Sequence, residues 1–138
     1  MKNKEIKSKL QQKNLYFKKI AFNRQNKMPE EIKEDFDVRY EYIDENTIIV
    51  DLIVKIKSKR DMSLEVVLTG EYVLEDSSNE LSIDEKKIIL ERNTVAIMFP
   101  FMRSEITLVT AQPNMVTVNL PPLNINALID NIKEKKTK

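Results

Sequence analysis

The stretch IIVDLIVKIK at positions 48–57 decides the fold of this chain. Aliphatic residues occupy every second position, and most of the charged residues stand between them. Because side chains alternate between the two faces of a strand, this pattern predicts a strand with one buried and one solvated face. The residues expected to face inward are Ile48, Val50, Leu52, Val54 and Ile56, and those expected to face outward are Asp51, Lys55 and Lys57.

Three flanking segments show related patterns. Residues 36–42 alternate strictly, residues 64–75 place Leu64, Val66, Leu68, Tyr72 and Leu74 on one side, and residues 15–24 place Tyr16, Ile20 and Phe22 opposite Lys19 and Asn23. Polar turns at 44–46 and 58–61 are short enough for hairpins. The sequence therefore predicts an antiparallel meander with one covered face.

Beyond residue 80 the pattern changes to that of helices. Ser82 and Glu85 have the spacing of a capping box, and apolar residues recur at helical intervals as far as Phe99. Pro100 is expected to interrupt the helix and to begin a second one, since proline fits a first helical turn. The second helix has an unusually wide apolar arc, which indicates burial on two sides. The residues expected at a subunit interface are Phe101, Glu105, Ile106, Leu108 and Val109.

The C-terminal part is predicted to be an extended connector followed by a short helix. Residues 115–119 are extended, and Pro121 and Pro122 stiffen the connector. Asn124 then caps a helix that runs to residue 132. We expect one domain over residues 14–132, between a basic N-terminal tail (1–13) and a basic C-terminal tail (133–138).

Composition disfavours most kinds of catalysis. The chain has no histidine, no cysteine and a single glycine, so the usual nucleophiles, zinc ligands and glycine-rich phosphate loops are missing. We therefore expect no enzyme, no metal and no cofactor. The net charge of +1, with no long apolar segment, leads us to expect no nucleic-acid binding, no membrane insertion and a cytoplasmic location.

A cluster of methionine and phenylalanine surrounds Pro100. Met98, Met102 and Met115 lie near Phe99 in this part of the sequence. Flexible thioethers suit surfaces that bind many partners, but they also fill gaps in ordinary cores. The sequence leaves both interpretations open.

Two blocks in the same region resemble the bacterial export chaperone SecB. IMFPFMRSEIT at 97–107 is similar to the family's aliphatic-Phe-Pro-aromatic-x-Arg helix start. VNLPPLNINAL at 118–128 is similar to its Leu-Asn-Leu-Ala-Pro-Val-Asn-Phe-Asp-Ala-Leu signature. Weaker similarities in the strands extend the resemblance over residues 15–129.

The resemblance implies an α+β fold: a four-stranded antiparallel sheet with helices packed on one face, assembling as a dimer of dimers. It also implies an ATP-independent chaperone that holds unfolded polypeptides, either preproteins for export or a dedicated client such as an antitoxin. The residues expected to line the client groove, with subunit core as their competing role, are Met98, Phe99, Met102, Met115, Leu123 and Leu128.

The family also delivers clients to the motor SecA through acidic residues on the exposed sheet face. Glu65 matches one such position, but Lys19 and Asn23 stand where the family presents acids. Fewer acids weaken the attraction for a basic partner. The short, lysine-rich C-terminus also differs from that of the export chaperone. A chaperone dedicated to one client, such as the antitoxin of a toxin–antitoxin pair, is one interpretation of this difference, and export remains the other.

Two other functions remain open at this point. One is a small-molecule-binding α+β domain, although no inward-facing charge is evident to anchor a ligand. The other is an adaptor that binds one folded partner through Ile49, Ile53 and Val67 on the outer sheet face.

Overall fold

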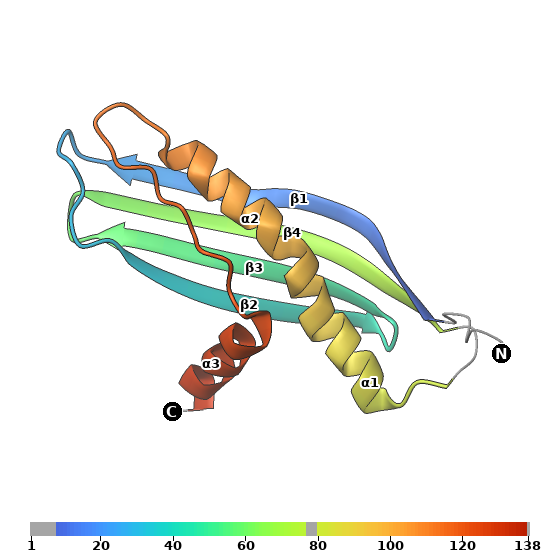
Figure 1. Ribbon diagram of the computed structural model, residues 1–138. Helices are drawn as coiled ribbons and strands as arrows, with labels where there is room; N and C mark the ends of the chain where they lie inside the picture. Colours follow the sequence, from blue (N-terminus) through green and yellow to red (C-terminus); the bar gives the residue numbers. More distant parts are fainter. Residues whose placement is uncertain (1–7, 77–79, 138) are drawn as a thin grey trace, which may run out of the picture.

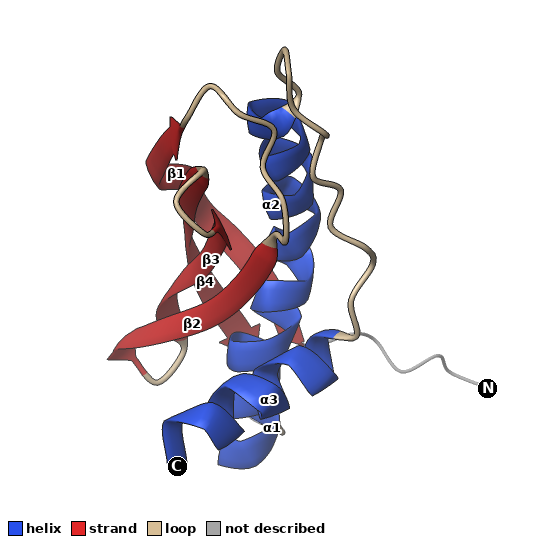
Figure 2. Cartoon of the chain, turned by 90° about the vertical axis from the view of Figure 1, so that its left-hand side faces the viewer, coloured by secondary structure: helices blue, strands red, loops and turns tan. Residues whose placement is uncertain are grey.

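The computed structural model describes residues 8–76 and 80–137 of the chain. A four-stranded antiparallel sheet comes first, and a layer of helices covers one of its faces (Figures 1 and 2). This confirms the predicted α+β fold. The elements are β1 (Ser8–Arg24), β2 (Lys33–Asp44), β3 (Thr47–Ser58), β4 (Met62–Asp76), α1 (Ile83–Ile88), the π-helical turn η1 (Ile89–Asn93), α2 (Thr94–Thr110) and α3 (Ile125–Thr137).

The strand order is β1-β4-β3-β2. The meander β2-β3-β4 forms as predicted, and β1 returns to pair with β4, which makes β1 and β2 the two edges. In the middle of the sheet Leu52 lies opposite Leu68, and Val54 lies opposite Val66. All five aliphatic residues predicted to face inward on β3 are fully buried, so the alternation identified the covered face correctly.

The prediction for β1 was wrong at one residue. The pairing register shifts between Phe17 and Lys19, so a bulge inserts an extra residue into the strand. Tyr16 therefore lies opposite Thr69 on the outer face and is 47% exposed, whereas Ile20 stays on the face of the helices. A bulge reverses the alternation of faces, which a strict period of two cannot anticipate.

The helical layer begins with the predicted capping box. Ser82 Oγ accepts the N–H of Glu85 at 3.1 Å, and the Glu85 carboxylate accepts the N–H of Ser82 at 3.2 Å. The predicted break at Pro100 is wrong, because Pro100 lies inside α2. Pro100 has no N–H to donate to the Ala96 carbonyl, and both residues lie on the exposed side of α2. Burial of the other side of α2 keeps the helix continuous.

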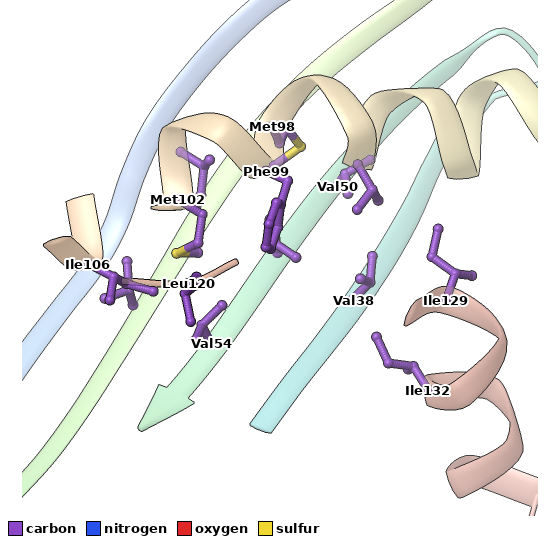
Figure 3. Packing of buried hydrophobic residues seen from close by; sticks show 14 of the residues in the cluster. Val38, Val50, Val54, Met98, Phe99, Met102, Ile106, Leu120, Ile129 and Ile132 are labelled. Carbon is purple, nitrogen blue, oxygen red and sulfur yellow. The ribbon is translucent and has the colours of Figure 1, made fainter. Parts of the chain in front are cut away.

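The core lies between the sheet and the helical layer. Met98, Met102 and Ile106 from α2 are fully buried against the strands. Leu120 lies beside Met102 and Val54, whereas Ile129 and Ile132 from α3 lie near Val38 of β2 (Figure 3). The helices thus cover the face that the strand pattern marked as apolar.

The charged ends of the chain belong in part to the fold. β1 begins at Ser8 and α3 extends through Thr137, so neither end of the predicted domain coincides with a structural boundary. The predicted tails accordingly contribute residues 8–13 to the sheet and residues 133–137 to a helix. Residues 1–7 and 138 lie outside the described part of the chain.

Candidate functional site

The inner side of α2 is core. Met98 and Met102 are fully buried and Phe99 is 4% exposed, so these three predicted groove residues offer no surface to a client. Ile106, predicted at a subunit interface, is also fully buried within the chain. The helix lies directly on the sheet, and the Met98 side chain fills the space above Gly70 of β4. Met98 and Met102 are therefore part of the hydrophobic core of the single chain.

The outer side of α2 carries exposed apolar residues. Phe101 is 50% exposed and Leu108 is 70% exposed, and Ile97, which the sequence did not single out, is 42% exposed. These three residues are named the outer stripe. Glu105 and Val109 flank it and are half-buried. A group of large apolar side chains in solvent is a feature of interaction surfaces.

A crossover segment, residues 115–124, connects α2 to α3 along the side of α2 (Figure 1). Val118 and Leu120 point into the core, whereas Asn119 is exposed. The segment forms no strand, and side chains of α2 hold it instead. Arg103 Nε, for example, donates to the Leu120 carbonyl at 2.9 Å. The sequence predicted the extended conformation but not the side chains that fix it.

A pocket of about 480 Å³ opens where the crossover segment meets α3 and the start of β2. Its apolar wall contains two predicted groove residues, Leu123 and Leu128, whereas Met115 packs partly buried against the core outside this pocket. We name it the Leu128 pocket. Its lining residues are Phe36, Leu123, Asn124, Ala127, Leu128, Asn131, Ile132, Glu134 and Lys135.

Sequence reasoning missed Phe36 and Ile132 as pocket residues. Both stood in the predicted apolar patterns of β2 and of the final helix, but no local signal shows that these two elements meet. Phe99 supports the pocket from beneath, since its ring centroid lies 6.3 Å from that of Phe36. Phe99 therefore positions a pocket residue without lining the pocket itself.

Ion pairs hold α3, which forms one wall of the Leu128 pocket, against β2 and η1. Lys135 lies 3.3 Å from Asp35 and Lys136 lies 2.9 Å from Asp37, both on β2. On the other side, the Arg92 guanidinium from η1 contacts Asp130 at 2.7 Å. The lysines that the sequence assigned to a tail thus hold the helix in place.

A buried carboxylate lies between η1 and β2. Glu91 in η1 is 7% exposed, and its carboxylate accepts a hydrogen bond from the Tyr42 hydroxyl at 2.6 Å. The Tyr40 hydroxyl donates to the Glu91 carbonyl at 2.7 Å. Burial, followed by the hydrogen bond to Glu91, raises the pKa of Tyr42. These contacts join β2 to the π-helical turn that precedes α2.

The outer face of the sheet is covered by ion pairs. Lys19 Nζ lies 2.7 Å from the Glu65 carboxylate, and this hydrogen bond is the main reason that the pKa of Glu65 is lowered. Ile53 and Val67 are only 6% and 8% exposed, because the side chains of charged neighbours cover them. The exposed apolar patch on which the adaptor hypothesis depended is therefore absent at these two residues. The negative charge of Glu65 is neutralised by Lys19 of the same chain.

Within residues 8–76 and 80–137, no group of three or more acidic, histidine or cysteine side chains is arranged to hold a metal ion. In the same ranges, no helix combines the length and the apolarity that crossing a membrane requires.

Sequence comparisons find one curated relative that is well matched. No protein-family model matches the chain. A protein of Methanocaldococcus jannaschii described as uncharacterized, MJ0357, is 32% identical over 108 residues. The match covers 74% of this chain and 66% of that protein, so it spans just under two thirds of the relative's length.

Structural comparisons identify the fold. The SecB-like chaperone Rv1957 of Mycobacterium tuberculosis, solved with a ChAD peptide from the HigA1 antitoxin, superimposes with a TM-score of 0.62. The match covers 83% of this chain and 90% of that chain at 9% sequence identity. A protein of unknown function from Streptococcus agalactiae matches with a TM-score of 0.48 at 11% identity. It covers 83% of this chain and 98% of that one. The match to Rv1957 shows that the chain has the SecB-like fold: a four-stranded antiparallel sheet with its helices on one side.

Proposed function

We propose that this protein is an ATP-independent chaperone that binds unfolded polypeptide segments at the Leu128 pocket. The observation that carries the proposal is an open pocket whose wall is built from Phe36, Leu123, Leu128 and Ile132. Asparagine and charged side chains form its rim. The similarity in fold to a SecB-like chaperone solved with a bound peptide supports the same function.

The energetics favour clients that are not folded. Full burial of one apolar client side chain contributes about 1.5–3 kcal/mol, and a native protein has already buried such side chains in its own core. A pocket that recognises apolar side chains therefore selects unfolded chains without a sequence code. No chemical step is needed, and we propose no catalysis.

We further propose a homotetramer in which the outer stripe of α2 is covered by another subunit. Ile97, Phe101 and Leu108 form an apolar surface that one chain leaves in solvent. Several pockets in one assembly would bind one long client at several points, which raises the overall affinity through effective concentration. The half-buried Glu105 and Val109 lie beside this surface.

The outer sheet face supports a dedicated client, such as an antitoxin, over export through SecA. Lys19 Nζ already forms an ion pair with the Glu65 carboxylate at 2.7 Å, and the Asn23 side chain carries no charge. A basic partner such as the SecA tail would have to displace that lysine before it reached the acid. The peptide bound to the structurally similar chaperone comes from an antitoxin.

The test compares binding to the unfolded and native forms of one slowly folding protein, with the mass of each complex recorded. We expect tight binding to the unfolded chain alone, in a complex that contains four copies of this protein. Replacing Leu123 and Leu128 together by serine should weaken this binding about tenfold or more, since two apolar contacts are lost. Ile83→Ser removes an isoleucine that is 82% exposed and lies outside the pocket, so it serves as the matched control.

Two results would count against the proposal. Equal binding by the Leu123/Leu128 variant and by Ile83→Ser would place the client elsewhere. A monomer that binds no unfolded chain would reject the chaperone and favour the small-molecule-binding domain. Phe101→Asp tests the assembly separately, because it should lower the mass of the oligomer while the circular dichroism of the fold is retained.

A further inference from the structure

The free edge of β2 is closed at its middle by a side chain from α3. We propose that Lys136 and Asp37 form an autoinhibitory contact, which prevents a second copy of this chain from pairing its own β2 strand with this edge. The contact acts on main-chain groups outside the Leu128 pocket. The inference therefore stands apart from the proposed chaperone function and concerns what keeps the sheet from extending on this side.

The main-chain groups of alternate residues in β2 point to the free edge. β2 is the last strand of the sheet, and an edge strand presents a row of N–H and C=O groups without a partner strand. Val38 lies opposite Leu52 of β3, but its N–H and its carbonyl both bond side chains instead. The register to β3 is unbroken around Val38, so the main-chain groups of Phe36 and Tyr40 point to the same edge.

Two charged side chains take the place of a partner strand at Val38. The Val38 N–H donates to Asp37 Oδ1 at 2.8 Å, and Lys136 Nζ donates to the Val38 carbonyl at 3.2 Å. Lys136 Nζ also lies 2.9 Å from the same oxygen of Asp37, so the two side chains fix each other. Figure 1 shows α3 alongside β2, from where Lys136 reaches this edge. An incoming strand would have to displace both side chains before it could bond Val38.

The edge is open on either side of this contact. In the described part of the chain, no side chain bonds the main-chain groups of Phe36 or Tyr40. The neighbouring Lys135 lies 3.3 Å from the Asp35 carboxylate. Among the residues that the structure describes, Lys136 is thus the one lysine of α3 that bonds the edge itself. Lysine at an exposed edge is a common protection against pairing between chains.

The partner that fits this edge is a second copy of β2. Antiparallel pairing around a two-fold axis at Val38 would let the two Val38 residues exchange N–H···O bonds. The same register places Asp37 of each copy opposite Arg39 of the other, and Phe36 opposite Tyr40. Opposite charges and aromatic pairs directly across a ladder both stabilise it. The middle of β2 is therefore complementary to itself.

The favourable part of this register coincides with the closed point. Farther out, Asp35 would lie opposite Glu41, and like charges directly opposite each other are destabilising. Self-pairing must therefore begin at the middle of β2, where Lys136 and Asp37 lie. The contact of one lysine with one peptide group is thus sufficient to close the edge.

The experiment compares the mass of Lys136→Met with that of the wild type by light scattering, over a range of protein concentrations. Methionine keeps the length of the side chain but has neither the charge nor the N–H donors. We expect Lys136→Met to associate with an increase in mass of about twofold or more, since pairing around a two-fold axis joins two assemblies. Amide hydrogen exchange at Phe36 and Tyr40 should be slower in the associated form, because a paired strand bonds these N–H groups.

Two variants serve as controls. Lys135→Met removes the neighbouring lysine and its ion pair with Asp35, so it tests any general loosening of the end of α3. Lys136→Arg keeps the positive charge and N–H donors at the edge. Both should retain the mass of the wild type.

Three results would overturn the inference. An unchanged mass for Lys136→Met at every concentration would show that the edge stays closed without the lysine. Equal association of Lys136→Met and Lys135→Met would indicate that loosening of α3 is the cause. Association with unchanged exchange at Phe36 and Tyr40 would place the contact elsewhere. Binding of unfolded chains by the wild type is measured separately, so none of these results decides the chaperone function.

Discussion

The sulfur of Met98 lies 3.1 Å from the position that a β-carbon on Gly70 would occupy, and Cε2 of Tyr72 lies 2.6 Å from the same point. Gly70 lies on β4, under α2, and is the chain's single glycine. Its lack of a side chain makes room for the Tyr72 ring and for the methionine above it. This close fit accounts for the full burial of Met98 in the core of the chain.

Gly70→Ala should destabilise the fold. The added methyl group would have to displace the Tyr72 ring, and overpacking of this kind costs about 1–3 kcal/mol. Urea denaturation followed by circular dichroism measures the change. Glu71→Ala, on the outer face of the same strand, is the control and should shift the free energy of unfolding by less. An unchanged urea midpoint for Gly70→Ala would show that the Tyr72 ring can move aside without loss of stability.

Thr110→Val should loosen the crossover segment. The buried Thr110 hydroxyl accepts the Val118 N–H at 2.9 Å and donates to the Ile106 carbonyl at 2.7 Å. Valine fills the same volume but leaves the Val118 N–H buried without a partner, at a cost of about 1–3 kcal/mol. Thr110→Ser keeps the hydroxyl and should retain slow amide exchange at Val118. Equally fast exchange in both variants would contradict this role of the hydroxyl.

Stability should fall in alkali because of Tyr72. Burial raises the pKa of this fully buried tyrosine to about 12, compared with about 10 in an unfolded chain. The folded state therefore holds the proton more tightly, and the resulting stability is fully present below pH ~10. It is lost as the pH rises to ~12, and amounts to roughly 2–3 kcal/mol. Denaturation of the wild type and of Tyr72→Phe across this interval should show a smaller fall for the variant; parallel curves would refute the assignment.

Glu65 should titrate below the usual glutamate range. Its hydrogen bond to Lys19 lowers its pKa, so the stability from this pair is present above the unfolded value of about 4.3 and is lost as the pH falls through the lower folded value. Because both side chains are partly exposed, we expect at most about 1 kcal/mol.

Carboxyl NMR measures the Glu65 pKa directly. Lys19→Met should raise it toward the unfolded value, because the cation that stabilises the carboxylate is gone. Lys18→Met removes a lysine that lies 3.8 Å from Asp51 and should leave the Glu65 pKa in place. The same Glu65 pKa in both variants would mean that Lys19 does not form an ion pair with Glu65 in solution.

Local patterns in the sequence were sufficient for much of the fold. The alternation around Val50 and Leu52 identified the covered face of the sheet, and Ser82 with Glu85 located the start of the first helix. Both features depend on residues only a few positions apart. The bulge after Phe17 was not predicted, and the predicted helix break at Pro100 was wrong, because packing of the neighbouring elements overrides the local preference at each point.

The candidate site, too, could be predicted only in part from the sequence. The amino-acid sequence by itself determined a two-layer α+β domain, an extended crossover with two prolines, and a helix carrying more apolar residues than one face requires. Only the tertiary structure decided which of those residues are covered: Met98 and Met102 lie on the sheet, whereas Leu123 and Leu128 meet Phe36 at an open pocket. The reason is physical, since exposure depends on how an element is rotated against partners distant in the chain, and hydrophobicity alone does not contain that information.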